Sequence, residues 1–281
     1  LGYSYQWDGG WQAGLAYQFD YKDMNIYNEG KLTLDLTFTH QLVRMGAAKD
    51  WNNIQVSLGI DFDYYHYHDL LSLDPLASAL FENSSLFSYF AGLVFNNLNE
   101  RSAPTKGMSW AVSYHLYTDN LFQYKDNNPI SVFDARWQGC FSPSSKLTVT
   151  PSFYGRVLSG SDNYPFAIIN MVGGTIPGRY MPQQIPLTGI NRAELSQAAL
   201  LVAGLSLRQR ILKNQYISVM GSYGRNSGKF HQILDSSESV DMAGVGIGYM
   251  YKSFLGPVEI QLNWSNQTKK VGWYAGFGFV F

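Results

Sequence analysis

Residues 53–64 read NIQVSLGIDFDY and alternate strictly between apolar and small or polar side chains. Neighbouring side chains of a β-strand point to opposite faces, so a period of two predicts a strand with one apolar and one polar face. The same alternation recurs at 11–20, 31–39, 108–117, 147–156, 243–251, 258–264 and 271–281. We therefore expect an all-β chain with about 13 strands.

The composition of the two faces favours a barrel in a membrane. Only 15% of the residues are charged, whereas soluble domains average about 25%. The polar face carries Gly, Ser, Thr, Gln, Asn and Tyr, and the apolar face ends in aromatic residues, namely Tyr64, Phe153, Tyr251 and Trp264. Strands of about ten residues with these features are typical of antiparallel transmembrane β-barrels. On this interpretation Leu34, Leu36 and Phe38 face lipid, and a secreted β-sandwich stays as the alternative.

Other classes are excluded by composition. Twenty basic and 21 acidic residues give a net charge of −1, which argues against a nucleic-acid partner. The single cysteine, Cys140, excludes a disulfide framework and a thiolate zinc site. The longest apolar stretch, 195–207, is too short for a spanning helix. We expect no catalytic residue, cofactor or metal ion in this chain, which lacks the G-x-S-x-G motif of serine hydrolases.

Connections between the expected strands alternate between short and long. In bacterial barrels the short turns are periplasmic and the long loops extracellular. This pattern predicts one barrel domain over residues 1–281 in the bacterial outer membrane, with a periplasmic C-terminus. The longest connection, 159–195, is expected to be an extracellular loop that folds into the lumen.

The least strand-like part of this loop is 164–189, YPFAIINMVGGTIPGRYMPQQIPLTG. Its charged residue at the tip, Arg179, needs a carboxylate partner if it enters the lumen, because an unpaired buried charge is strongly unfavourable. Strand alternation places Asp134 and Glu259 on the lumen face, and Glu194 lies at the foot of the loop. An exposed arginine is the alternative interpretation.

Two motifs resemble the Omp85 superfamily. The first is the loop motif, with Pro165-Phe166, Asn170 and a run whose members are Gly173, Gly174, Pro177, Gly178, Arg179 and Tyr180. The second is a hairpin that combines NNLN at 96–99 with PTKG at 104–107. The resemblance implies a 16-stranded barrel whose N-terminal part and any periplasmic domain precede this chain. It also implies a loop that enters the lumen, where Arg179 forms a salt bridge.

The run 173–191 is most similar to barrels at the C-terminus of bacterial patatin-like phospholipases. This likeness implies a membrane domain that anchors or translocates a protein segment, and a hydrolase only in the parent protein. Expected partners are outer-membrane lipid, lipopolysaccharide, an N-terminal passenger domain and the barrel assembly machinery, which would read the insertion signal Phe277, Phe279 and Phe281. A diffusion porin and a barrel enzyme acting on envelope lipids stay as alternatives.

Overall fold

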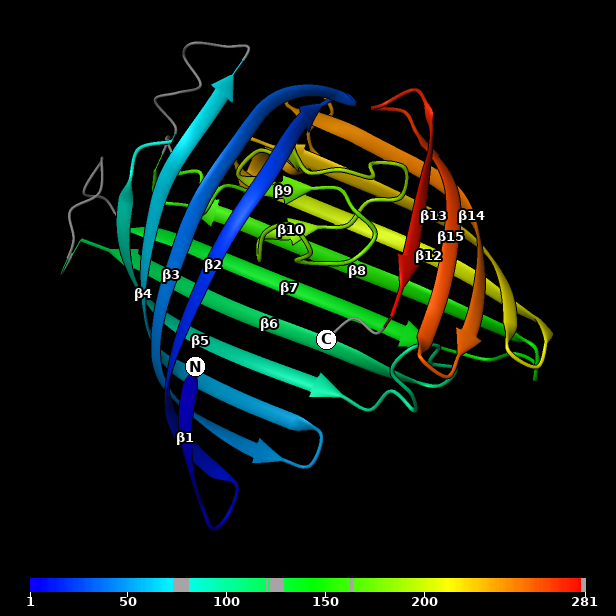
Figure 1. The fold of residues 1–281 in the computed structure, drawn as a ribbon, viewed down its shortest axis with the longest axis horizontal. Helices are drawn as coiled ribbons and strands as arrows, with labels where there is room; N and C mark the ends of the chain where they lie inside the picture. The colour runs from blue at the N-terminus through cyan, green and yellow to red at the C-terminus, as the bar shows by residue number, and fades with distance from the viewer. Residues whose placement is uncertain (73–80, 120, 122–128, 162–163, 279–281) are drawn as a thin grey trace.

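The computed structural model describes residues 1–72, 81–119, 121, 129–161 and 164–278 as one curled sheet (Figure 1). Its long strands are β1 (Gly2–Trp7), β2 (Trp11–Asn28), β3 (Lys31–Trp51), β4 (Ile54–Ser72), β5 (Ser84–Asn96), β6 (Gly107–Thr118), β7 (Ile130–Cys140), β8 (Leu147–Ser159), β12 (Ala199–Leu212), β13 (Gln215–Ser227), β14 (Ser239–Ser253), β15 (Gly256–Ser265) and β16 (Val271–Phe277). These thirteen strands form the wall and confirm the predicted all-β barrel fold. No helix in the described part of the chain is long and apolar enough to span a membrane.

The long connection between β8 and β12 carries three two-residue strands. They are β9 (Met171–Val172), β10 (Gln184–Ile185) and β11 (Glu194–Leu195). With them the sheet counts sixteen strands, and the connection lies within the curve of the wall (Figure 1). A short 3₁₀ helix, η2 (Phe230–Leu234), joins β13 to β14.

The wall is open between its first and last strands. Successive wall strands pair antiparallel, but no described residue of β16 pairs with β1 or β2. The strand β1 covers only the first part of β2, from Trp11 to Ala16. The turn between β2 and β3 meets the turn between β15 and β16, since a Cβ added at Gly30 would lie 3.3 Å from Thr268. Below this contact the two edges separate, and we call the gap the seam (Figure 1).

The two ends of the barrel differ in their connections. At one end, here called the turn end, most connections are short, such as Asn52-Asn53 and Lys213-Asn214. The opposite end, here called the loop end, holds the connection 160–198. The ten residues 97–106 between β5 and β6 are the longest connection at the turn end.

An apolar belt surrounds the outer face. Along β4, Leu58 is 59% exposed on this face, whereas Asp61 on the opposite face is only 3% exposed. The belt runs from Ile54 to Tyr64 on β4 and from Trp11 to Tyr21 on β2. About eleven residues per strand is the length that a tilted strand needs to cross a bilayer.

Three strands continue beyond this belt, and there the polarity reverses. The side chains of Leu34, Leu36 and Phe38 are buried on the inner face, not exposed to lipid as the sequence had suggested. Thr37 alternates with them and points outward beside Asp23 and Asp69. The reason is that the loop fills the lumen at this level and supplies an apolar surface, which includes Phe166 and Ile168.

Candidate functional site

Hydrogen bonds hold the root of the loop between β8 and β12 against the wall. Asn170 is fully buried, and its amide donates to the carbonyls of Gln197 (2.7 Å) and Ala198 (3.0 Å). Its Oδ1 accepts a hydrogen bond from the guanidinium of Arg156 on β8, which also donates to the Ile168 carbonyl at 2.8 Å. Arg156 is 6% exposed, so these acceptors replace the water that its charge has lost.

A second set of contacts ties the loop to the first strands. The backbone N–H of Tyr27 on β2 donates to the Ala193 carbonyl at 2.9 Å. The N–H of Gly30 donates to the Glu194 carboxylate at 3.0 Å. The Lys22 ammonium of β2 donates to the Tyr180 carbonyl at 3.1 Å. The loop therefore occupies part of the free edge of β2.

A third set ties the same loop to the last strands. Asn191 accepts a hydrogen bond from Asn263 of β15 at 2.7 Å and donates to the Trp273 carbonyl of β16 at 3.4 Å. The loop backbone lies directly on the wall here: Gly189 has φ +87°, and a Cβ at this position would collide with the Trp264 carbonyl. Only glycine fits both the backbone angle and the contact.

The tip of the loop is held by Gln184, which is fully buried. Its amide donates to the carbonyls of Gly173 and Ile176, and its oxygen accepts from the N–H of Tyr180 at 3.0 Å. The positive φ of Gly173, Gly174 and Gly178 turns the chain around this side chain. The glycines of the predicted motif thus shape the tip, and Gln184 fixes it.

Arg179 projects from this tip to the inner face of β16. Its Nη1 donates to the Tyr274 hydroxyl at 3.1 Å, and the guanidinium lies 5.5 Å from the centre of the Tyr274 ring. None of the six ion pairs among the described residues includes Arg179. A tyrosine thus occupies the place where we expected a carboxylate.

Each expected carboxylate has a different partner. Asp134 pairs with Arg136 at 3.0 Å, and Glu259 accepts from Gln261 at 2.6 Å. Burial raises the pKa of Glu194 in the loop, an effect opposed by hydrogen bonds from the N–H groups of Gly30 and Glu29. The remaining predicted residues lie outside the loop: Phe277 is exposed on the outer face, and Phe279 and Phe281 lie outside the described residues.

Charges on the inner face of the early strands are paired across the sheet. Arg44 of β3 binds Asp61 of β4 through two bonds of 2.7 and 2.6 Å. His40 lies between two carboxylates, 2.7 Å from Asp63 and 3.5 Å from Asp20. No group of three or more His, Cys, Asp and Glu side chains in the described part could hold a metal ion.

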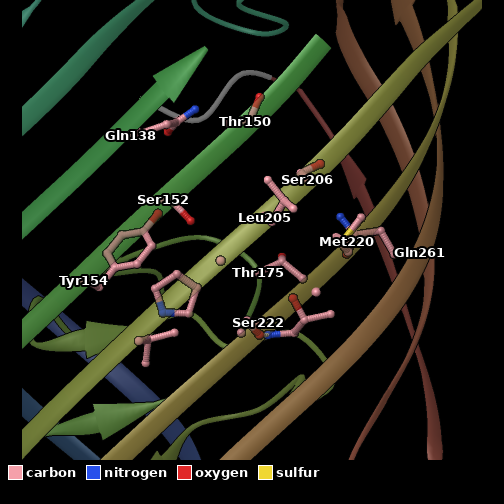
Figure 2. Close-up of a pocket in the computed structure, with 16 residues that line it drawn as sticks. Gln138, Thr150, Ser152, Tyr154, Thr175, Leu205, Ser206, Met220, Ser222 and Gln261 are labelled. Carbon is pink, nitrogen blue, oxygen red and sulfur yellow. Dashed lines mark hydrogen bonds between the residues drawn. The ribbon is translucent and has the colours of Figure 1, made fainter. Parts of the chain in front are cut away.

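One cavity under the loop has an uncharged lining. This cavity has a volume of about 210 Å³ and lies between the loop residue Thr175 and the wall (Figure 2). Its wall side is lined by uncharged polar groups, among them Gln138, Thr150, Ser152, Ser206, Ser222 and Gln261. None of its sixteen lining residues is charged, so it lacks the opposed charges of a porin constriction.

A second segment crosses the lumen at the turn end. The connection 97–106 accepts a hydrogen bond from Arg208 of β12 at Pro104 and from Ser142 at Thr105, the latter at 2.8 Å. Glu100 forms an ion pair of 2.7 Å with Lys252 of β14. The connection from β5 to β6 is thus bound to β12 and β14, which lie beyond β7 and β8 in the sheet.

The family model of the OMP85 superfamily matches residues 16–281. The chain belongs to the OMP85 superfamily. This places the barrel in the outer membrane. No curated protein matches the chain.

One solved structure has the same fold. The BamA barrel from Haemophilus ducreyi, in a form lacking POTRA domains 1–3, superposes with a TM-score of 0.72 at 14% identity, covering 98% of this chain and 60% of that one. This OMP85 chain therefore spans about three fifths of the BamA chain. A bacterial polysaccharide outer membrane secretin (TM-score 0.42, 14% identity, 95% and 82% covered) and a Pseudomonas aeruginosa FadL homologue (0.34, 10%, 94% and 68%) are more distant.

Proposed function

We propose that this barrel anchors or translocates a protein segment and is the membrane domain of a patatin-like phospholipase. The observation that carries the proposal is the bridging loop. One loop binds Lys22 and Tyr27 on one side of the seam and Asn263 and Tyr274 on the other. A loop so placed keeps the lumen shut and braces two strand edges that do not pair with each other.

The proposal also includes the strands that would close the barrel. Unpaired strand edges inside a bilayer are very costly, because lipid offers no hydrogen bonds. The free edges of β1 and β16 therefore support three further strands that complete a 16-stranded wall. The short connections at the turn end support a periplasmic C-terminus.

Conductance in planar bilayers tests the closed lumen. The full-length protein is expected to give small, unsteady currents, because the loop fills the lumen. Arg179→Ala removes the contact with Tyr274 and is expected to raise the open probability or the current. Lys269→Ala, an exposed residue at the loop end, is the control. Large, stable steps from the unchanged protein would favour a porin and contradict the proposal.

The enzymatic part is tested separately. Phospholipid hydrolysis is expected from the full-length protein and not from residues 1–281. His115 stacks against Phe90 at 5.9 Å on the inner face of the wall, away from lipid. Hydrolysis by the barrel alone that is lost in His115→Ala would instead place the chemistry in this chain.

A further inference from the structure

Three neighbouring connections at the turn end, and the last residues of the strand that leads into one of them, carry exposed apolar side chains. The connections join β7 to β8, β12 to β13, and β14 to β15. The apolar residues are Phe141 (53% exposed), Ile211 (43%), Leu212 (60%), Phe254 (92%) and Leu255 (59%). We call these five residues the apolar rim. Exposed large side chains gathered in one place indicate a contact with another apolar phase.

Backbone contacts hold the three connections side by side. The N–H of Arg210 donates to the Lys146 carbonyl at 2.7 Å, and its guanidinium donates to the Ser145 carbonyl at 2.9 Å. The N–H of Lys252 donates to the Asn214 carbonyl at 2.8 Å. The five residues of the apolar rim therefore lie on neighbouring turns of the same end of the barrel.

The rim faces outward, toward the membrane. Phe141 forms a bridge with Val149, which lies on the outer face of β8. A Cβ added at Gly139 would contact the rings of both Phe141 and Trp137, so Phe141 continues the outer belt past the end of the strand. Ile211 is exposed at the end of β12, in the irregular step of the pairing between Arg210 and Leu212.

Three cations lie at the same turns, Lys146 and Lys213 within the connections and Arg210 near the end of β12. Lys146, Arg210 and Lys213 are exposed, and none of them belongs to the ion pairs of the described residues. The sequence has no Asp or Glu in 135–161, 195–234 or 242–258. These stretches contain all three connections, so no acidic residue of their own offsets the cations.

We infer that the apolar rim and its three cations bind anionic phospholipid of the leaflet at the turn end. The apolar side chains would enter the boundary between headgroups and acyl chains, and the cations would meet the lipid phosphates. The inference rests on the membrane location stated above and concerns the outer wall, so it is independent of what the lumen does.

Lipid selectivity measures the charge contribution. The full-length protein is reconstituted in phosphatidylcholine vesicles with acyl-chain spin-labelled phosphatidylglycerol or phosphatidylcholine, and electron spin resonance gives the relative association with the barrel. We expect a preference for phosphatidylglycerol of about fivefold at low salt. The triple variant Lys146→Gln, Arg210→Gln, Lys213→Gln should bring this ratio to about one, and so should high salt.

The matched control removes three exposed cations from the loop end, by Lys229→Gln, Lys269→Gln and Lys270→Gln. This variant should keep the selectivity of the unchanged protein. Equal association of both lipids with the unchanged protein, or the same loss in both triple variants, would overturn the inference. Conductance is recorded on the same samples, so that failure of the closed lumen is seen separately.

A fluorescent probe tests the apolar contribution. An NBD group on Phe254→Cys, with Cys140→Ser to remove the native thiol, should show blue-shifted emission in vesicles. Water-soluble quenchers should reach it less than they reach the same label on Lys229→Cys, an exposed residue at the loop end. A label at 254 that stays in water would overturn the inference. The apolar rim would then be a surface for a protein partner.

Discussion

Asn170 concentrates several hydrogen bonds in one buried side chain at the root of the loop. Replacing it with Ala leaves the Arg156 guanidinium and two carbonyls, those of Gln197 and Ala198, short of partners. Buried groups without partners are costly, so we expect Asn170→Ala to lower the free energy of unfolding by about 2–4 kcal/mol. Denaturant titration followed by tryptophan fluorescence measures this loss.

Asn214→Ala is the control for this prediction, because Asn214 is exposed in a turn. It should change the free energy of unfolding by about 0.5 kcal/mol or less. Equal stability of the two variants would mean that the loop root does not depend on the Asn170 amide.

Glu194 makes the stability of the folded state depend on pH. Its pKa is raised in the folded state, chiefly by burial. The unfolded chain therefore ionises at lower pH than the folded one, and the folded state loses stability as pH rises from the unfolded pKa to the folded pKa. Glu194→Gln keeps an oxygen that can accept from Gly30 and removes the charge.

We expect Glu194→Gln to be more stable than the unchanged protein at neutral pH. The difference should shrink as pH falls through the folded pKa and vanish below the unfolded pKa. Unfolding midpoints between pH 3 and 8 measure it. A difference that is constant with pH would show that the carboxylate charge is not the cause.

The residues of the loop motif could be found from the sequence, but their contacts could not. Strand alternation correctly puts Asp134 and Glu259 on the inner face. Residues two apart on a strand share a face, so Arg136 and Gln261 reach these carboxylates before a distant loop can. Such local competition between partners is invisible in alternation alone.

At the level of elements, the extended parts of β2, β3 and β4 behave as a soluble structure with an apolar interior. Phe38 is fully buried, and its ring centre lies 6.4 Å from that of Phe166 in the loop. Phe38→Ala should cost about 3–5 kcal/mol of unfolding free energy. Thr37→Ala, on the outer face of the same strand, should cost about 0.5 kcal/mol or less.

Denaturant titration of both variants measures this contrast. It also distinguishes the two orientations of the strand. If Phe38 faced lipid, its truncation would leave no cavity beside Phe166. A small effect of Phe38→Ala would contradict the inner position.

The sequence predicts the strands themselves well and the orientation of one region badly. A period of two reports that the faces differ, but it does not say which face is inside. The apolar face of β4 meets lipid along the belt, whereas the apolar face of β3 between Leu34 and Phe38 meets the loop. Whether the apolar face of a strand points outward or inward depends on what fills the lumen at that level. This is a property of the tertiary structure.

For the whole molecule, the key connection is that of the loop with the last strand. A Cβ at Gly272 of β16 would lie 3.4 Å from the Cγ of Asn191, close to the place where a cysteine sulfur at 191 would be. The double variant Asn191→Cys, Gly272→Cys, with Cys140→Ser, is therefore expected to form a disulfide. Mass spectrometry of the folded barrel detects it.

The oxidised double variant is expected to give quieter and smaller currents than its reduced form in planar bilayers. The same reducing agent should leave the currents of the Cys140→Ser protein unchanged. A disulfide that forms readily but leaves the currents as they were would mean that this contact does not limit opening.

The bridging loop also sets an order of events during folding. Its partners are far away along the chain: 158 positions separate Lys22 from Tyr180, and 95 separate Arg179 from Tyr274. Contacts of such range form only after a large loss of chain entropy. The loop can reach both edges only once the wall has curled, so filling of the lumen is a late step. Until then the growing barrel has an empty interior, and this interval is when another polypeptide could enter it.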